Sequence, residues 1–383
     1  MFKSTPEGAK EFLVPIQTKP PARFFALAQS PQQLKQLLMV AGVDRYFQFA
    51  RCYRDEGGRA DRQPEFTQMD MEMSFVRDMK PVETVIEGAV RAAWSAVTGF
   101  PRAPPPLPPG AFPRIALSDA LRKYGSDKPD LGFGMAIDDE GAVRCPDLAR
   151  VTSRSERDAI RGPTRADVVG NDVVLRSTSR ADVGTARLRA AAVMRSKGVP
   201  LPPGELAPRR PFWVHGFGLF ELDAEQPMRL ASVHHPFTAA ESDDGEALAK
   251  ALDSNDRSAL LELRGNHVDL VCDGVELGGG SVRIHDATVQ RRVLCGPLGL
   301  SPSECEAKFG HLLRALELGA PPHGGFAVGF DRFVALLCGA TSLNRVLAFP
   351  KSSAGTDPMT GAPCEADEAA LRAVGLSSLP PPP

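Results

Sequence analysis

Residues 46–76 constrain the fold of this chain more than any other stretch. Apolar and polar residues alternate with a period of two on both sides of a charged segment, which predicts two β-strands. In the second strand, the methionines at positions 69, 71 and 73 share one face and polar side chains share the other. A loop of about ten residues joins the strands, whereas tight hairpins need only two to five. We therefore expect an antiparallel pair whose loop has a function.

The polar face of this pair has two interpretations. A single alternating strand usually presents such a face to solvent, on the outside of an antiparallel sheet. Here, however, Arg54 ends the first strand, and Gln68 and Asp70 follow in its partner. Cations and carboxylates would then converge on one face, which suits a ligand that carries both phosphate and amino groups. The charged loop favours this second interpretation.

Three strings resemble one family. Arg54-Asp-Glu, followed by Arg62-Gln-Pro-Glu-Phe-Thr-Gln-Met-Asp70, resembles motif 2 of class II aminoacyl-tRNA synthetases, in the form of bacterial and organellar aspartyl-tRNA synthetases. Gly329-Phe-Asp-Arg332 is similar to motif 3, and residues 346–351 extend that match. The segment from Glu276 to Arg283, with its three glycines, also resembles the family. The resemblance covers about residues 4–135 and 205–357, and it implies an α+β fold. An antiparallel sheet would bear the site on one face and helices on the other.

The resemblance also implies a role for each matching residue. The residues expected to be catalytic are Arg54 and Arg332. Those expected to bind L-aspartate are Glu7, Gln32, Lys35, Arg54, Asp70, His234 and Arg283. Those expected to bind ATP are Arg54, Asp55, Glu56, Gln63, Glu276, Gly329, Phe330, Asp331 and Arg332.

In the implied site, Lys35 and Arg283 clasp the side-chain carboxylate of aspartate. Asparagine in the same place would leave two buried cations uncompensated, and sites of this kind can reject a ligand by about 10⁴-fold. In isolation, a lysine at helical spacing such as Lys35 would be interpreted as a solvated side chain. The expected reaction is ATP-dependent activation of aspartate, followed by transfer to the 3′ end of tRNA(Asp).

Residues 267–285 predict a β-hairpin, because Asp273-Gly274 is a strong turn signal. Asp269 and Glu276 would face each other across it if the register allows. Two carboxylates beside a triphosphate are natural ligands for Mg²⁺, which takes oxygen donors and keeps several waters. The three glycines let the backbone approach a ligand closely, and the alternative, a flexible bulge, does not explain why Glu276 and Arg283 flank them.

The sequence contains no zinc signature. His234 and His235 are adjacent, and we expect neighbours on an extended chain to point apart. The seven cysteines show no metal-ligand spacing and no disulfide pattern, which indicates a reducing compartment.

Several helices are expected between the motifs. Ser30 and Pro31 start one that Gly42 ends. A second should span about 82–98, and a short amphipathic helix should lie within 112–128. Ser301-Pro-Ser-Glu304 forms a capping box for a helix whose buried stripe is Cys305, Phe309, Leu312, Leu313 and Leu316.

We divide the chain into a first catalytic part (1–134), a shortened insertion (135–211), a second catalytic part (212–357) and a tail (358–383) without fixed structure. A helix is expected over 185–196. Because the insertion is short, we do not expect it to form a complete core of its own. Arg and Lys outnumber Asp and Glu in it, which fits either a solvated surface or a weak contact with the tRNA backbone.

The family begins with an anticodon-binding barrel and a motif 1 that builds a homodimer. Only residues 2–6 resemble its trailing edge, so we expect either a fragment or a protein that works without those parts. No run of eighteen apolar residues predicts a membrane span, and no targeting segment is recognisable. The expected compartment is an organelle matrix, mitochondrial or other, or a bacterial-type cytoplasm. The alternatives are an inactive or weakly active relative that binds amino acid or tRNA in a regulatory role, and an enzyme that amidates free aspartate.

Overall fold

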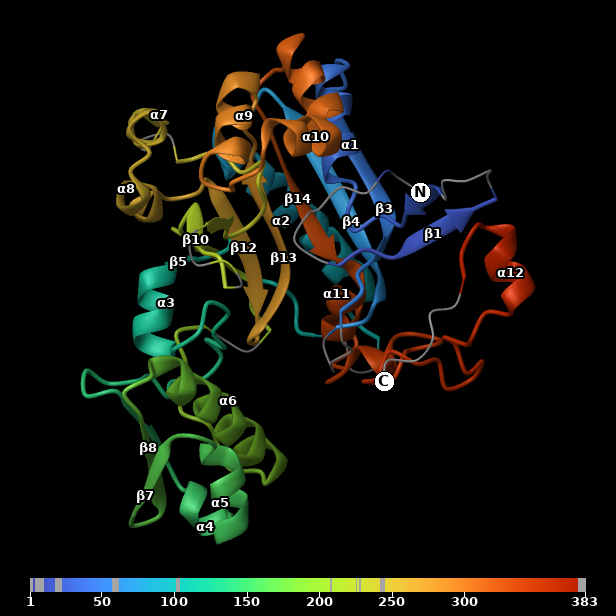
Figure 1. Ribbon diagram of the computed structural model, residues 1–383. Coiled ribbons are helices and arrows are strands. Elements are labelled where there is room, and N and C mark those ends of the chain that lie inside the picture. Colours follow the sequence, from blue (N-terminus) through green and yellow to red (C-terminus); the bar gives the residue numbers. More distant parts are fainter. Residues whose placement is uncertain are drawn as a thin grey trace.

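Seven strands form one central sheet in the computed structural model (Figure 1), which describes residues 3, 10–17, 23–56, 62–100, 104–206, 209–224, 226, 229–241 and 245–377. Neighbouring strands run antiparallel, except for the parallel pair β5 and β9. Across the sheet the order is β3 (Arg45–Tyr53), β4 (Glu65–Ser74), β14 (His323–Gly329), β13 (Val275–Val282), β12 (His267–Cys272), β9 (Phe212–His215) and β5 (Arg114–Ala116). The strand pair expected within 46–76 is confirmed as β3 and β4, and β3 is an edge of the sheet.

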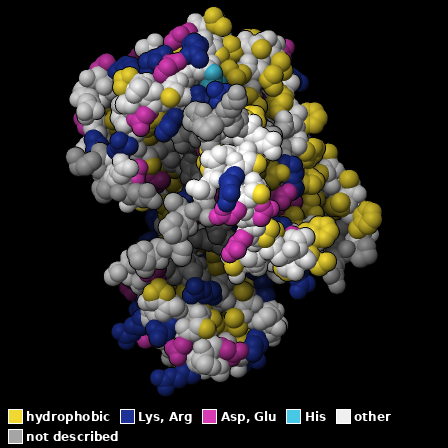
Figure 2. Space-filling view, turned by 45° about the vertical axis from the view of Figure 1, so that its right-hand side comes forward, with side chains coloured by type: hydrophobic (Ala, Val, Ile, Leu, Met, Phe, Trp, Pro, Cys, Tyr) yellow, Lys and Arg dark blue, Asp and Glu magenta, His cyan; other side chains and the backbone are white. Residues whose placement is uncertain are grey.

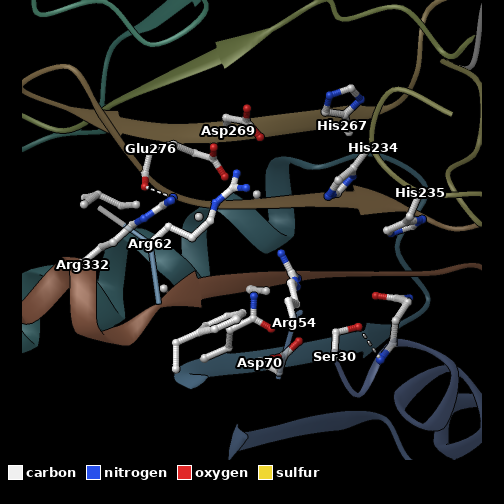
Figure 3. A pocket seen from close by; sticks show the side chains of 18 of the residues that line it. Ser30, Arg54, Arg62, Asp70, His234, His235, His267, Asp269, Glu276 and Arg332 are labelled. Carbon is white, nitrogen blue, oxygen red and sulfur yellow. Dashed lines mark hydrogen bonds between the residues drawn. The ribbon is translucent and has the colours of Figure 1, made fainter. Parts of the chain in front are cut away.

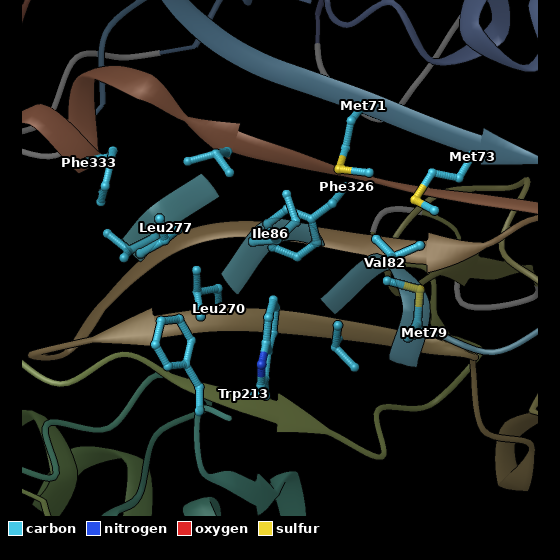
Figure 4. Close-up of a cluster of buried hydrophobic side chains, with 14 of the residues drawn as sticks. Met71, Met73, Met79, Val82, Ile86, Trp213, Leu270, Leu277, Phe326 and Phe333 are labelled. Carbon is cyan, nitrogen blue, oxygen red and sulfur yellow. The ribbon is translucent and has the colours of Figure 1, made fainter. Parts of the chain in front are cut away.

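One face of the sheet packs against helices. Helix α2 (Lys80–Val97) places apolar residues every four positions against it, and Val82, Ile86, Val90 and Trp94 are buried there. Met71 and Met73 come from β4, and the Phe326 ring of β14 meets Trp213 of β9 edge-on, with ring centres 5.5 Å apart (Figure 4). Phe333 of α11 (Phe330–Leu337) completes this core. The expected α+β architecture is confirmed.

The alternation in β4 explains the opposite face. Asp70 pairs with Ala327 and Glu72 with Gly325, and directly paired residues point to the same side of a sheet. The carboxylates of β4 therefore lie on the side away from α2. Helix α1 (Gln32–Val40) lies beside this edge, and the backbone N–H of Gln32 donates to the Ser30 hydroxyl at 3.2 Å.

Helix α10 (Pro302–Glu317) packs against α1, and α9 (Ala287–Cys295) packs against α10. Both reciprocal bonds of the Ser301–Glu304 capping box are present, and all five residues of the predicted stripe are buried. The remaining elements of this body are β1 (Leu13–Ile16), β2 (Arg23–Ala26), β10 (Phe220–Leu222), β11 (Leu230–Ser232), α7 (Gly245–Ser254), α8 (Arg257–Glu262) and η2 (Leu343–Arg345). In the tail, where no fixed structure was expected, α12 (Glu368–Ala373) forms a helix without buried residues.

The insertion folds into a lobe below the sheet (Figure 1). Its elements are β6 (Ala142–Cys145), α4 (Leu148–Val151), α5 (Arg154–Arg161), β7 (Arg165–Val169), β8 (Asp172–Arg176) and α6 (Arg180–Ser196), and α3 (Leu117–Tyr124) packs against α6. Contrary to our expectation, the lobe has a hydrophobic cluster of its own, which includes Phe133, Leu148, Leu175 and Met194. Three short strands covered on one side by α6 supply it, so the small size of the segment did not prevent a core.

Lys and Arg side chains gather on the surface of the lobe (Figure 2). Many of them are ion-paired within the lobe, as in Arg144 with Asp172 and Lys197 with Glu156, at 2.6 and 3.0 Å. Among the described residues, no helix combines the length and the apolar character needed to cross a membrane.

Candidate active site

A cavity of about 680 Å³ lies on the polar face of the sheet (Figure 3). Strands β4, β12, β13 and β14 form its floor, and the N-terminal end of α11 and the segment 233–237 form part of its wall. Arg54, Arg283 and Arg332, which are far apart in the sequence, all line this one cavity. The structure therefore brings together on one face the cations that the sequence analysis expected to converge.

Most residues singled out from the sequence line the cavity, namely Gln32, Lys35, Arg54, Glu56, Gln63, Asp70, His234, Asp269, Glu276, Arg283, Gly329, Asp331 and Arg332. Asp55 does not: it follows Arg54 on extended chain, where successive side chains point apart, and it lines a separate hollow with Lys10 and Phe24. The ring of Phe330 packs edge-on against Phe49 instead, at 5.2 Å between centres. Glu7 lies outside the described residues.

Hydrogen bonds join the sequence strings to one another. Asp331 accepts from the backbone N–H of Thr67 at 2.8 Å, which ties motif 3 to motif 2. Gln63 accepts from the backbone N–H of Lys351 at 2.7 Å and donates to its carbonyl oxygen at 3.1 Å. Arg332 donates to the carbonyl oxygen of Glu276 at 3.1 Å. The segments that each resemble the family in the sequence are thus held together by hydrogen bonds around one cavity.

Two buried cations meet two buried carboxylates at one end of the cavity. Lys35 Nζ lies 3.0 Å from Asp70 and 3.3 Å from Glu72, and Arg283 Nε lies 2.9 Å from Glu72. Burial alone would raise the pKa of Glu72, but Arg283 and Lys35 outweigh it and hold that pKa below its usual value. Glu72 was not among the residues predicted for the site. Its position two residues after Asp70, on the same strand face, was the available signal.

The carboxylate of Glu72 occupies the space where any other residue at the paired position 325 would place its Cβ. A Cβ on Gly325 would lie 1.9 Å from Oε2 of Glu72 and 2.2 Å from the carbonyl oxygen of Met71. The absence of a side chain at Gly325 is therefore what makes room for the charge cluster.

A β-bulge aims Glu276 toward the cavity. Asp269 pairs with Gly279 and Leu270 with Gly278, but Val271 then pairs with Glu276, so one residue of β13 is left over. The extra residue reverses the side-chain alternation and turns Glu276 to the same face as Asp269. The sequence had suggested that the two carboxylates face each other directly if the register allows. In the structure they are diagonal neighbours on one face. Burial, and then the charges of Glu276 and Asp127, raise the pKa of Asp269 well above its usual value.

These two carboxylates suit a magnesium ion. Both offer hard oxygen donors, and their mutual repulsion would be relieved by a cation between them. Within the described ranges, no group of three or more His, Cys, Asp or Glu side chains is placed to hold a metal by itself. A metal bound here would therefore take its other ligands from water and from phosphate oxygens.

The histidines are arranged differently from our expectation. The rings of His234 and His235 do not point apart but stack, with centres 4.4 Å apart, and His267 lies 5.0 Å from His234. The turn after His235 bends the chain, so the extended geometry assumed from the sequence does not apply. Burial lowers the pKa of His267 to about 4 and lowers those of His234 and His235 well below their usual value. All three rings are therefore neutral near pH 7.

Several buried polar atoms that face the cavity have no hydrogen-bond partner within the described part of the chain. They are Nε of Arg54, Oδ2 of Asp70 and Nδ1 of His234. Such atoms are costly unless something binds them, so this end of the cavity is built for a polar ligand.

The comparison with protein families decides the assignment. A family model described as "tRNA synthetases class II (D, K and N)" matches residues 1–353. The chain belongs to this family.

Over the aligned spans, relatives are more than a third identical to this chain. An aspartate–tRNA(Asp/Asn) ligase of Mycolicibacterium gilvum is 40% identical over 99% of this chain and 72% of its own length. A mitochondrial aspartate–tRNA ligase of Rattus norvegicus is 39% identical over 95% of this chain and 62% of its own. An aspartate–tRNA(Asp/Asn) ligase of Symbiobacterium thermophilum is 40% identical over 95% of this chain and 69% of its own length.

The chain therefore spans roughly two thirds of the length of these relatives. The match with the first covers 443 positions, more than the 383 residues present here, so that relative has residues within the matched span that this chain lacks. Among solved structures, an aspartyl tRNA synthetase from Entamoeba histolytica aligns with 87% of this chain and 52% of its own at 16% identity and a TM-score of 0.49.

Proposed function

We propose that this chain is an aspartate–tRNA ligase, which activates L-aspartate with ATP and transfers it to the 3′ end of tRNA(Asp). The observation that carries the proposal is the buried cluster of Lys35, Arg283, Asp70 and Glu72 in the wall of a cavity that Arg54 and Arg332 also line. Its aspartate-specific relatives support the same substrate.

The charges of the cluster explain selection of aspartate. An amino acid bound with its ammonium group at Asp70 neutralises that carboxylate. The two positive charges of Lys35 and Arg283 then exceed the single negative charge of Glu72 by one. The side-chain carboxylate of aspartate cancels this excess charge. Asparagine would leave that charge buried and unpaired, and a buried unpaired charge costs several kcal/mol.

The activation step requires positioning and charge neutralisation more than a nucleophilic side chain. In the proposed reaction the α-carboxylate of aspartate attacks the α-phosphorus, the bond to the bridging oxygen breaks, and pyrophosphate leaves. Arg54 would hold the carboxylate and the α-phosphate in line, and Arg332 the γ-phosphate. Asp269 and Glu276 would hold Mg²⁺, which would neutralise charge on the phosphates. Glu56 and Gln63 would flank the nucleotide.

ATP–pyrophosphate exchange tests the proposal, with aspartate, with asparagine and without amino acid. We expect exchange with aspartate alone, and aspartyl-tRNA when tRNA(Asp) is added. Aspartate-dependent exchange that yields asparagine with ammonia, but no charged tRNA, would favour the amidating enzyme. Binding of aspartate without exchange would favour a regulatory relative. Light scattering of the same sample tests the dimer that the family resemblance implies. We also propose a bacterial cytoplasm or an organelle matrix as its compartment.

A further inference from the structure

The loop over 125–135, which leads from α3 into the lobe, passes the Asp269–Glu276 end of the cavity. Asp127 lines the cavity, and Lys128 Nζ lies 3.9 Å from Oε2 of Glu276. The charge of Asp127 also contributes to the raised pKa of Asp269. The loop is therefore close enough to influence what binds between the two carboxylates.

A buried arginine of the lobe fixes the path of this loop. Arg187 of α6 is only 1% exposed, and its Nη2 donates to the carbonyl oxygens of Asp130 at 2.9 Å and of Phe133 at 3.0 Å. Its Nε donates to the carbonyl oxygen of Met135. The guanidinium lies between the rings of Tyr124 and Phe133, at 4.7 and 3.9 Å from their centres. Burying a cation is costly, and all three of these hydrogen bonds go to one loop.

The same helix also contacts the hairpin that carries the two carboxylates. Arg195 of α6 donates to Oδ2 of Asp130 at 2.9 Å. A Cβ on Gly274, in the turn between β12 and β13, would lie 3.6 Å from Cβ of Asp130 and 3.8 Å from Cδ2 of Leu188. Loop, helix and hairpin turn are therefore packed together, with Asp130 buried at their junction.

Among the residues that the structure describes, the amino-acid end of the cavity shows no such connection to the lobe. The side-chain hydrogen bonds of Lys35 run to β4, and those of Arg283 run to β4, β13 and His235. A change in the lobe should thus reach one end of the cavity and not the other.

We propose that the inserted lobe positions the metal and nucleotide end of the active site, and that Arg187 is the positioning residue. It holds loop 125–135, and through it Asp127 and Lys128, against the hairpin that carries Asp269 and Glu276. This inference rests on the proposed function of the cavity and deepens it, because it assigns the lobe a part in binding Mg·ATP.

Arg187→Lys tests the inference in the full chain, because it keeps the charge but a single ammonium cannot reach the three carbonyl oxygens. We expect the KM for ATP in exchange, and the Kd of Mg·ATP from calorimetry, to rise by about tenfold or more, while the KM for aspartate changes less than about twofold. Arg189→Ala, on the exposed side of the same helix, is the matched control and should leave all three constants unchanged.

Lys128→Ala provides a second test that does not depend on the fold of the lobe, since this side chain is half exposed. We expect weaker Mg·ATP binding with an unchanged Tm. The inference is overturned if both variants bind Mg·ATP like the wild type, or if Arg187→Lys raises the KM for aspartate as much as that for ATP. If the wild type shows no aspartate-dependent exchange but Arg187→Lys still weakens Mg·ATP binding, the proposed function fails and the inference stands.

Discussion

The guanidinium of Arg283 holds the carboxylate of Glu72 with two hydrogen bonds, from Nε at 2.9 Å and from Nη2 at 3.1 Å. Both side chains are almost completely buried, and Lys35 approaches the same carboxylate. A two-pronged pair of this kind fixes direction as well as distance. Glu72 thus sets the orientation of both cations proposed to receive the substrate carboxylate.

Glu72→Gln should therefore damage stability and aspartate binding together. Removing the charge leaves Lys35 and Arg283 undercompensated, and breaking a buried pair costs about 3 to 5 kcal/mol. We expect a loss of this size in urea unfolding, and a raised KM for aspartate in exchange. Glu65→Gln, which breaks the exposed pair with Arg51, should change the unfolding free energy by less than about 1 kcal/mol. Equal effects of the two substitutions would contradict the importance assigned to the buried pair.

Lys35→Leu should abolish aspartate-dependent pyrophosphate exchange while Mg·ATP still binds. The substitution removes one of the two cations that select the side-chain carboxylate, but Arg332 and the Asp269–Glu276 pair remain. Exchange assays and calorimetry with Mg·ATP measure the two effects separately. Lys123→Leu, at the exposed pair with Glu205, is the control. Normal exchange by Lys35→Leu would remove Lys35 from the site.

Gly325→Ala should destabilise the protein by about 3 kcal/mol or more. The added methyl group would overlap with Glu72 and with the backbone of β4, which cannot move without breaking the sheet. Gly88→Ala, in the exposed face of α2 with no atom near the new methyl group, should instead stabilise by up to about 1 kcal/mol. The Tm of the two variants should shift in opposite directions, and a tolerated alanine at 325 would refute the geometry.

Stability should fall as the pH drops from about 6.5 toward 4, partly because of His267. Burial lowers its pKa to about 4 in the folded state, against 6.5 for an ordinary histidine, so the unfolded chain binds a proton that the folded chain does not. Above pH 6.5 both states are neutral and the effect vanishes. Between pH 6.5 and 5 we expect His267 to contribute a loss of about 2 kcal/mol. Urea unfolding of His267→Asn should show a correspondingly weaker pH dependence, and an unchanged slope would count against this assignment.

Glu276→Gln should weaken binding of a divalent cation and make Asp269 more acidic. One ligand of the proposed Mg²⁺ is lost, while Asp269 loses a repelling neighbour, so its pKa should fall toward the usual value. Electron paramagnetic resonance of Mn²⁺ measures the affinity, for which we expect a loss of about tenfold or more. Glu317→Gln, a surface carboxylate paired with Arg291, should leave Mn²⁺ affinity unchanged.

The local patterns predicted most of the elements, because alternation, capping boxes and turn signals act over a few residues. β3, β4, α2, α10 and the hairpin all lie within a few residues of the expected positions. Membership of the family followed from strings that the sheet then brings to one cavity.

What the sequence did not reveal depends on register and on long-range packing. The bulge that aims Glu276 is visible only in strand pairing, and the stacking of His234 on His235 depends on a local bend that the sequence did not reveal. The burial of Glu72 depends on Gly325, which lies opposite it on β14 and leaves room for its carboxylate. The core of the lobe was missed because length alone did not show how tightly its strands pack on α6.

The three glycines of β13 leave space on both faces of the sheet, two of them on the core side and one on the cavity side. A Cβ on Gly278 or Gly280 would meet the ring of Phe326 at 2.8 and 2.6 Å, whereas one on Gly279 would meet Asp269 at 2.7 Å. Along Gly278–Gly280, only the backbone of β13 separates the hydrophobic core from the cavity. A substitution of Phe326 in the core should therefore displace the same backbone that forms the floor of the cavity.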